Sequence, residues 1–168
     1  MALTALMCAA CAAAPLNKPI EGGPVDIGAG SLTAARKFLE GQWNLLSFEV
    51  LPPGREPVML KGTGILSYDE FGNLSMEIRV DEPTSKTLAS LGIPVTAGAL
   101  SSTGRTVVDM ENRKLTYVIQ GQPPLGAPSG PLALNRPRYW EVEGRNLTLT
   151  TRGDDGKPVS IGRWQKVQ

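Results

Sequence analysis

Most of the side chains that carry out enzyme chemistry are missing from the body of this chain. Histidine is absent, which removes the usual general base and the commonest metal ligand. Both cysteines, Cys8 and Cys11, stand near the start, so the rest of the sequence offers no disulfide, zinc site or catalytic thiol. No glycine-rich phosphate loop is present either. Catalysis would depend on Glu, Asp, Tyr or Arg, and we predict neither a cofactor nor a metal.

Arg138 is the charged residue with the most informative setting. It alternates with Trp140 in a strand-like segment, so the two side chains share one face. A guanidinium on an apolar face is costly unless it meets an anion. That anion is either a carboxylate of the chain, Glu77 or Glu49, or the carboxylate of a ligand. The alternative is a solvated arginine at the rim of the sheet.

Composition and charge limit the class of protein. At 168 residues with 41% hydrophobic residues, the chain suits one soluble globular domain with a sizeable core. The formal net charge is +1, with no run of Lys or Arg, so we expect no nucleic-acid partner. No stretch approaches the ~20 apolar residues of a membrane-spanning helix.

The first 14 residues, MALTALMCAACAAA, are uncharged and small or apolar. They are typical of the end of a secretory signal. Cys11, preceded by Ala9 and Ala10, also matches a bacterial lipobox, which predicts a lipidated, exported protein in the periplasm or anchored to the outer membrane. The alternative is an Ala-rich leader on a cytoplasmic protein. Residues 15–30, rich in Pro and Gly, indicate a tether to the domain at 31–168.

Strand-like segments separated by turn residues fill most of that domain. Leu74, Met76, Ile78 and Val80 alternate with polar residues, as in a strand with one buried and one wet face. Because the segments follow one another through short turns, they favour an all-β, eight-stranded antiparallel up-and-down barrel. The predicted strands are 42–51, 62–69, 74–80, 104–110, 114–120, 136–142, 147–151 and 159–167.

Three other segments interrupt or precede the strands. Ser31 is a predicted N-cap for a short helix over residues 32–40 that covers one end of the barrel through Phe38 and Leu39. Residues 81–103 form a long insertion with two helical turns at 85–91, and residues 121–131 form a Pro-rich, extended loop. Both insertions are placed to border the open end.

Several of these motifs together resemble the lipocalin-like domain family of bacteria and fungi. They are Gly41-x-Trp43-x-Leu45, residues 64–68 with Phe71-Gly72 and residues 74–76, and residues 138–142 running into residues 146–150. The resemblance covers about Phe38 to Val167 and implies an eight-stranded calycin barrel, open at one end, whose activity it leaves undefined. It also implies that Trp43 closes the other end, where Arg163 could stack on it. The insertion at 81–103 is shorter than in that family and has no aromatic residue.

A barrel of this size either fills its interior with side chains or holds one small ligand. Alternation from Trp43 points Leu45 and Ser47 inward, and the strand at 114–120 contributes Leu115, Tyr117 and Ile119. The alternative for every such residue is a core role. The predicted ligand-binding residues are Leu45, Leu66, Tyr68, Met76, Ile78, Tyr117, Arg138 and Trp140.

Two classes of function remain open, and a third agrees less well with the sequence. The first is a carrier of a small hydrophobic molecule, fatty acyl or terpenoid because only nine of the residues are aromatic. The second is a cofactor-independent cyclase or isomerase of a lipid-like or polyketide substrate. The third is a periplasmic protease inhibitor, which fits the N-terminal arm but not the missing disulfide.

Overall fold

The computed structural model describes residues 32–118, 130, 133 and 136–168. Within these residues the chain forms two helices and nine strands. In chain order they are α1 (Leu32–Leu39), β1 (Gly41–Val50), β2 (Val58–Met59), β3 (Gly62–Tyr68), β4 (Asn73–Val80), α2 (Glu82–Ser90), β5 (Ala99–Asp109), β6 (Lys114–Val118), β7 (Arg138–Glu143), β8 (Asn146–Arg152) and β9 (Pro158–Lys166).

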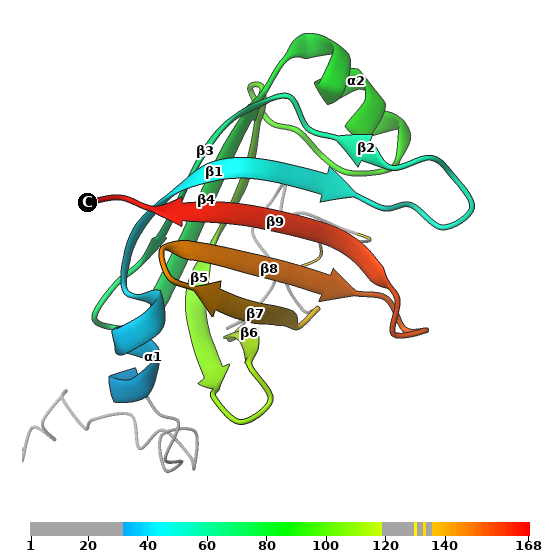
Figure 1. The fold of residues 1–168 in the computed structure, drawn as a ribbon. Coiled ribbons are helices and arrows are strands. Elements are labelled where there is room, and N and C mark those ends of the chain that lie inside the picture. The colour runs from blue at the N-terminus through cyan, green and yellow to red at the C-terminus, as the bar shows by residue number, and fades with distance from the viewer. Residues whose placement is uncertain (1–31, 119–129, 131–132, 134–135) are drawn as a thin grey trace, which may run out of the picture.

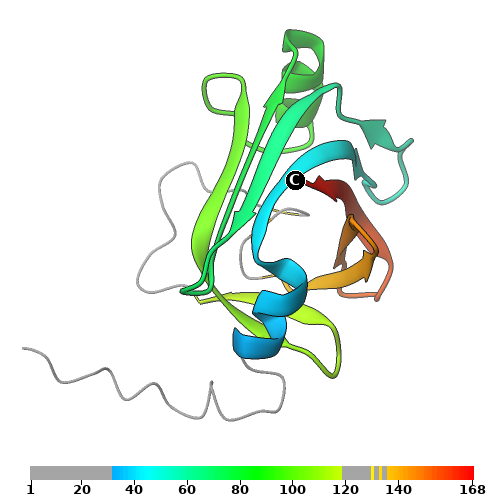
Figure 2. The same ribbon diagram turned by 60° about the vertical axis from the view of Figure 1, so that its left-hand side comes forward.

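Eight of these strands close into an antiparallel barrel (Figures 1 and 2). Their order around the wall is β1-β3-β4-β5-β6-β7-β8-β9, and β1 pairs with β9 to complete the circle. The short β2 lies outside this circle and pairs with the end of β1 at Glu49 and Val50. Consecutive wall strands are neighbours, as in an up-and-down barrel. The predicted eight-stranded fold is confirmed.

Hydrophobic alternation determines which face of each strand is inside. In β4, Leu74, Met76 and Ile78 are buried, whereas the residues between them are exposed. Asn73 begins this strand, and its side chain binds Asp69 across the turn from β3. Because β4 is a central strand paired along its length with β3 and β5, a slip of one residue would expose this whole apolar row.

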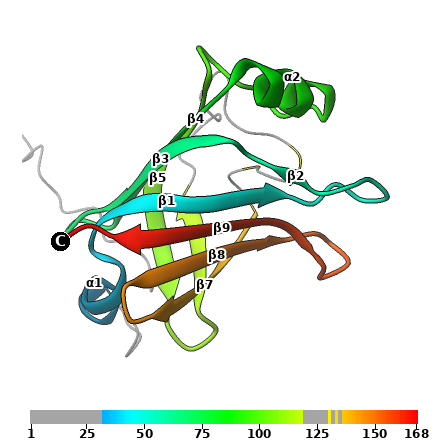
Figure 3. The ribbon, with the colours of Figure 1, turned by 45° about the horizontal axis from the view of Figure 1, so that its top comes forward.

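The two helices lie at opposite ends of the long β3, β4 and β5 strands (Figures 1 and 3). In α1, Ala35 and Leu39 are buried, and the Leu39 carbonyl accepts a hydrogen bond of 2.9 Å from Trp43 Nε1. Trp43 is 1% exposed. The α1 end of the barrel is therefore covered, as expected. Of the two residues expected to cover this end, only Leu39 is buried, because Phe38 is 39% exposed and stacks on Trp140 with 6.2 Å between ring centroids.

The cation beside Trp43 differs from the expected one. Lys166 Nζ lies 5.2 Å from the Trp43 ring centroid, whereas Arg163 binds Glu49 at 2.7 Å. The prediction that Arg163 stacks on Trp43 is wrong, because Trp43 pairs with Lys166 across the β1–β9 ladder and Arg163 lies farther along it.

A β-bulge in β1 changes which residues point inward after Leu45. The register against β9 shifts between Leu45 and Ser47, so Phe48 and Val50 are the buried residues. Ser47 is instead within 3.4 Å of the exposed Arg163 guanidinium. The expectation that Ser47 points into the barrel is wrong, since a bulge adds one residue and reverses the alternation.

The insertion between β4 and β5 is shorter than the sequence pattern predicted. Asp81 caps α2 by accepting a hydrogen bond of 2.9 Å from Thr84 N, and the helix begins three residues before the predicted start. Strand β5 begins at Ala99 rather than at residue 104. Its inward residue Ser102 is polar, so the hydrophobic alternation that marks a strand is hidden there.

Among the described residues, the strands β6 and β7 share the fewest paired positions of any two neighbouring wall strands. Only Lys114↔Tyr139 and Leu115↔Arg138 pair across this seam among the described residues. Strand β6 is described to Val118, and the predicted inward residue Ile119 lies outside the described residues. Arg138, the first residue of β7, is therefore part of the last described pair between these two strands.

Candidate ligand-binding site

A small cavity lies inside the barrel and touches five strands. Its volume is about 20 Å³, enough for a single water molecule. Apolar side chains form much of its wall, together with one cation, two hydroxyls and one indole. The lining residues are Phe48, Met76, Arg138, Leu149, Thr151, Ser160 and Trp164.

Arg138 is buried rather than solvated. It is 6% exposed, and burial lowers the pKa of its guanidinium from the usual value. The guanidinium lies 4.7 Å from the Tyr117 ring centroid, a cation–π distance, and Nη1 donates to the Arg136 carbonyl at 3.1 Å. The interpretation of Arg138 as a rim residue is therefore wrong.

Neither of the two expected carboxylates accounts for the Arg138 charge. Glu77 binds Arg79 at 2.8 Å, and Glu49 binds Arg163 at 2.7 Å. Both pairs are partly or largely exposed on the outer face of the wall. The prediction that one of them faces Arg138 is wrong, because Glu49 and Glu77 point outward in their strands.

The Tyr117 ring that supports Arg138 is itself fixed from two sides. The Ser102 hydroxyl donates to Tyr117 Oη at 3.0 Å inside the barrel. A Cβ atom on Gly104 would stand 2.9 Å from Tyr117 Cδ1, so only glycine leaves room for the ring there. Two residues of β5 thus set the position of an aromatic face on β6, and that face positions the guanidinium of β7.

Trp164 supplies a hydrogen-bond donor that has no partner. The residue is 0% exposed, and its Nε1 atom makes no hydrogen bond. A Cβ atom on Gly162 would lie 2.8 Å from this nitrogen and 3.1 Å from the Phe48 ring, so the indole edge lies over Gly162 beside Phe48. Buried donors are nearly always paired, so the unpaired N–H of a residue that lines a cavity marks a candidate binding position.

Two further buried polar groups are Tyr68 Oη, which has the Thr106 hydroxyl as its neighbour, and Trp140 Nε1, which has no hydrogen-bond partner. Burial raises the pKa of Tyr68 above its usual value. The neighbouring Thr106 hydroxyl donates to the Gly72 carbonyl at 3.1 Å and so satisfies a different acceptor. Neither Tyr68 nor Trp140 lines the cavity, so these groups lie apart from the Arg138 site.

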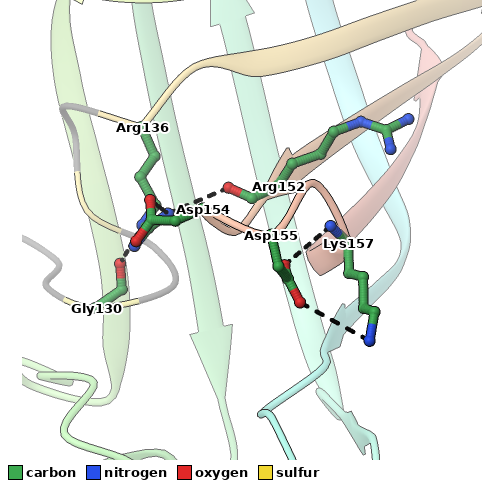
Figure 4. A network of polar contacts seen from close by, with 6 residues as sticks. All are labelled: Gly130, Arg136, Arg152, Asp154, Asp155 and Lys157. Carbon is green, nitrogen blue, oxygen red and sulfur yellow. Dashed lines mark hydrogen bonds and ion pairs between the residues drawn. The ribbon is translucent and has the colours of Figure 1, made fainter.

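The start of β7 is held in place by a polar network at the barrel edge (Figure 4). Arg136 donates to the Gly130 carbonyl at 3.2 Å, to the Arg152 carbonyl at 3.3 Å and to Asp154 at 3.1 Å. Asp154 belongs to the predicted Asp-Asp-Gly hairpin between β8 and β9, which is confirmed. Since Arg136 lies two residues before Arg138, this network also fixes the backbone that carries the buried cation.

A larger hollow lies on the outside of the wall. It measures about 690 Å³ and is bordered mainly by outward-facing residues of β3, β4 and β5, among them Ile65, Glu77, Arg79 and Thr103. The Glu77–Arg79 ion pair lies within it. Of the described residues, only Met76 borders both this hollow and the interior cavity. The outer hollow contains no buried, unpartnered polar group.

The predicted ligand-binding residues are divided among three places. Met76 and Arg138 line the interior cavity. Leu45 is half-buried and borders the outer hollow. The others, Leu66, Tyr68, Ile78, Tyr117 and Trp140, are buried in the core without lining the cavity. These five residues therefore pack in the core, which was the alternative to ligand binding for each of them.

Sequence reasoning missed five of the lining residues. Phe48 was hidden by the bulge, which reverses the alternation of β1. Thr151 and Ser160 are small hydroxyl residues, which in a β-strand look like surface positions until the register is known. Leu149 and Trp164 stand at inward positions of β8 and β9, where strict alternation could have identified them.

The described residues give no sign of a metal centre, since no three His, Cys, Asp or Glu side chains cluster among them. None of the described helices has the length and apolar character needed to cross a membrane. No protein-family model matches the chain, and no curated protein matches its sequence.

Proposed function

We propose that this barrel binds a small hydrophobic molecule, fatty acyl or terpenoid in kind, in its interior. The observation that carries the proposal is the unpartnered indole N–H of Trp164, a residue that lines a cavity inside the barrel. Phe48, Met76 and Leu149 give that cavity an apolar lining. Ligand sites in proteins commonly combine apolar walls with a few placed polar groups.

The cavity must enlarge to accept such a molecule, because about 20 Å³ holds one water. Met76 is the lining residue best suited to move, since its side chain is unbranched and adapts to irregular space. Its flexibility lets it change rotamer without displacing the backbone of β4.

The resemblance to lipocalin-like proteins is part of the same proposal. It is supported by the order of its motifs and by a closed barrel that has Trp43 at the end covered by α1. Proteins of that architecture hold small molecules inside the wall. The predicted export and lipidation at Cys11 would place the site outside the cytoplasm.

Binding is best tested with a neutral fluorescent probe, N-phenyl-1-naphthylamine, whose emission rises in apolar surroundings. We expect saturable binding to the wild-type protein. Thr151→Leu places a larger apolar side chain in the cavity and should weaken binding on the order of tenfold or more, because overpacked sites do not expand freely. Fluorescence titration measures both affinities.

Thr150→Leu is the matched control, since Thr150 is adjacent in β8 but faces the other side of the wall. Its probe affinity should equal that of the wild type, and thermal unfolding should show that both variants are folded. Absence of saturable binding to the wild-type protein, or equal affinity in both variants, would contradict interior binding.

The enzyme alternative gains no specific support from the site. Among the described residues that line the cavity there is no Asp, Glu or Tyr. General acid–base chemistry would need one of these groups within hydrogen-bond reach of the substrate. Carrier function is therefore the proposal we develop.

A further inference from the structure

We infer that the interior site recognises the acidic head group of its ligand, a carboxylate bound by Arg138 and by the indole N–H of Trp164. This inference rests on the proposed function and makes it more specific. It predicts which end of a small apolar molecule lies deepest in the barrel. The acid is placed at the cavity, and the hydrocarbon part lies against the apolar lining.

The polar groups around the cavity match an acceptor. Arg138 and Trp164 can only donate hydrogen bonds, and the hydroxyls of Thr151 and Ser160 can donate as well as accept. None of the described residues that line the cavity is acidic. A carboxylate, which only accepts, complements this set, whereas an amine or another pure donor would leave the buried Trp164 N–H without an acceptor.

The indole N–H of Trp164 is the more specific of the two proposed contacts to the carboxylate. Its indole N–H is fully buried and has no partner, so a ligand oxygen placed there would gain a hydrogen bond without breaking one. Gly162 permits the position, because a side chain there would meet the indole nitrogen and the Phe48 ring. Packing against Gly162 and Phe48 therefore fixes the position of the donor.

Arg138 contributes charge in a position that is set in advance. Its guanidinium lies 4.7 Å from the Tyr117 ring centroid and donates a hydrogen bond of 3.1 Å to the Arg136 carbonyl, and both of these partners are neutral. In a buried site, a hydrogen bond between ionised partners is stronger than one between neutral groups. A carboxylate should therefore bind more tightly than an alcohol of the same chain length.

Calorimetric titration with octanoate and with 1-octanol tests this preference. We expect wild-type protein to bind octanoate more tightly than octanol, on the order of tenfold or more. Arg138→Met should remove the preference while leaving octanol affinity similar. Arg163→Met is the matched control, since Arg163 binds Glu49 on the outer face, and it should keep the preference intact.

Trp164→Phe provides a second variant that keeps an aromatic ring and removes the N–H donor. It should lower octanoate affinity severalfold and leave octanol affinity nearly unchanged, a result that also decides the matter if Arg138→Met does not fold. Equal wild-type affinity for the two probes, or a preference that survives in both variants, would overturn the inference while leaving the proposed function intact. Failure of both octanoate and octanol to bind would overturn the inference together with interior binding.

Discussion

Two glycines decide where the large side chains lie inside this barrel. Gly104 leaves room for the Tyr117 ring, and Gly162 leaves room for the edge of the Trp164 indole. In each case a Cβ atom would come within 3 Å of the aromatic side chain. The candidate site therefore depends on residues that never touch the cavity, because their lack of a side chain determines the position of those that do.

The hydrogen bond between Ser102 and Tyr117 offers a test at the scale of single residues. Ser102→Ala should lower the free energy of unfolding by about 1–2 kcal/mol, since the buried Tyr117 hydroxyl loses its partner. Tyr117→Phe should cost a similar amount, and the double variant should cost less than the sum of the two. Denaturant unfolding of the three variants measures this coupling.

Ser101→Ala is the control for that series, because Ser101 is the adjacent residue of β5 on the exposed face. It should change stability by no more than about 0.5 kcal/mol. A strictly additive double variant would show that the hydroxyls do not interact.

Turns and helix starts are organised by aspartates that bind backbone N–H groups. Asp69 accepts hydrogen bonds from the Asn73 side chain and from the N–H groups of Asn73 and Phe71, which lowers the pKa of its carboxyl. Asp81, which caps α2, and Asp109, the last residue of β5, have lowered pKa values for the same kind of reason. In each case an ionised aspartate accepts hydrogen bonds from backbone N–H groups and so fixes the position of the turn or helix start.

The pKa of Asp69 gives the β3–β4 hairpin a predictable pH dependence. Because the pKa is lower in the folded protein, ionised Asp69 adds stability above its unfolded pKa of about 3.9, and that stability is lost as pH falls through the folded value. Asp69→Ala should lower the melting temperature at neutral pH, and the difference from wild type should shrink in acid. A difference that stays constant from neutral to acidic pH would contradict this role of the carboxylate.

Element positions were predictable from the sequence wherever burial alternates with period two. Strand β4 was found within one residue, because its inward row is wholly apolar. The start of β5 was missed since Ser102 is an inward polar residue, and the inward face of β1 was misassigned after the bulge. Both failures have one cause, which is that pairing with a neighbouring strand, and not local pattern, fixes the register there.

The candidate site was predictable only in part for the same reason. Arg138 was identified because a cation beside Trp140 is unusual, and Met76 because it shares a clear apolar face. Thr151 and Ser160 come together only through the β8–β9 ladder, which no local pattern reveals. A cavity is formed by residues distant in sequence, so its lining follows from closure of the sheet.

At the scale of the whole molecule, closure gives the barrel two different ends. The end near α1 is covered through Leu39 and Trp43, and the interior cavity lies between strands β1, β4, β7, β8 and β9. The predicted leader, tether and lipidated Cys11 lie outside the described residues, and they stay predictions. Within the described residues, the barrel provides an interior site that contains buried hydrogen-bond donors.

The three tryptophans allow the central claim, that a ligand binds inside the barrel at Trp164, to be tested in one spectrum. Each indole N–H gives its own signal in a nitrogen–proton correlation spectrum. On titration with octanoate, the Trp164 signal should move downfield and saturate as its N–H gains an acceptor, whereas the Trp43 signal, already bonded to the Leu39 carbonyl, should stay in place. An unchanged Trp164 signal at saturating octanoate would contradict the account.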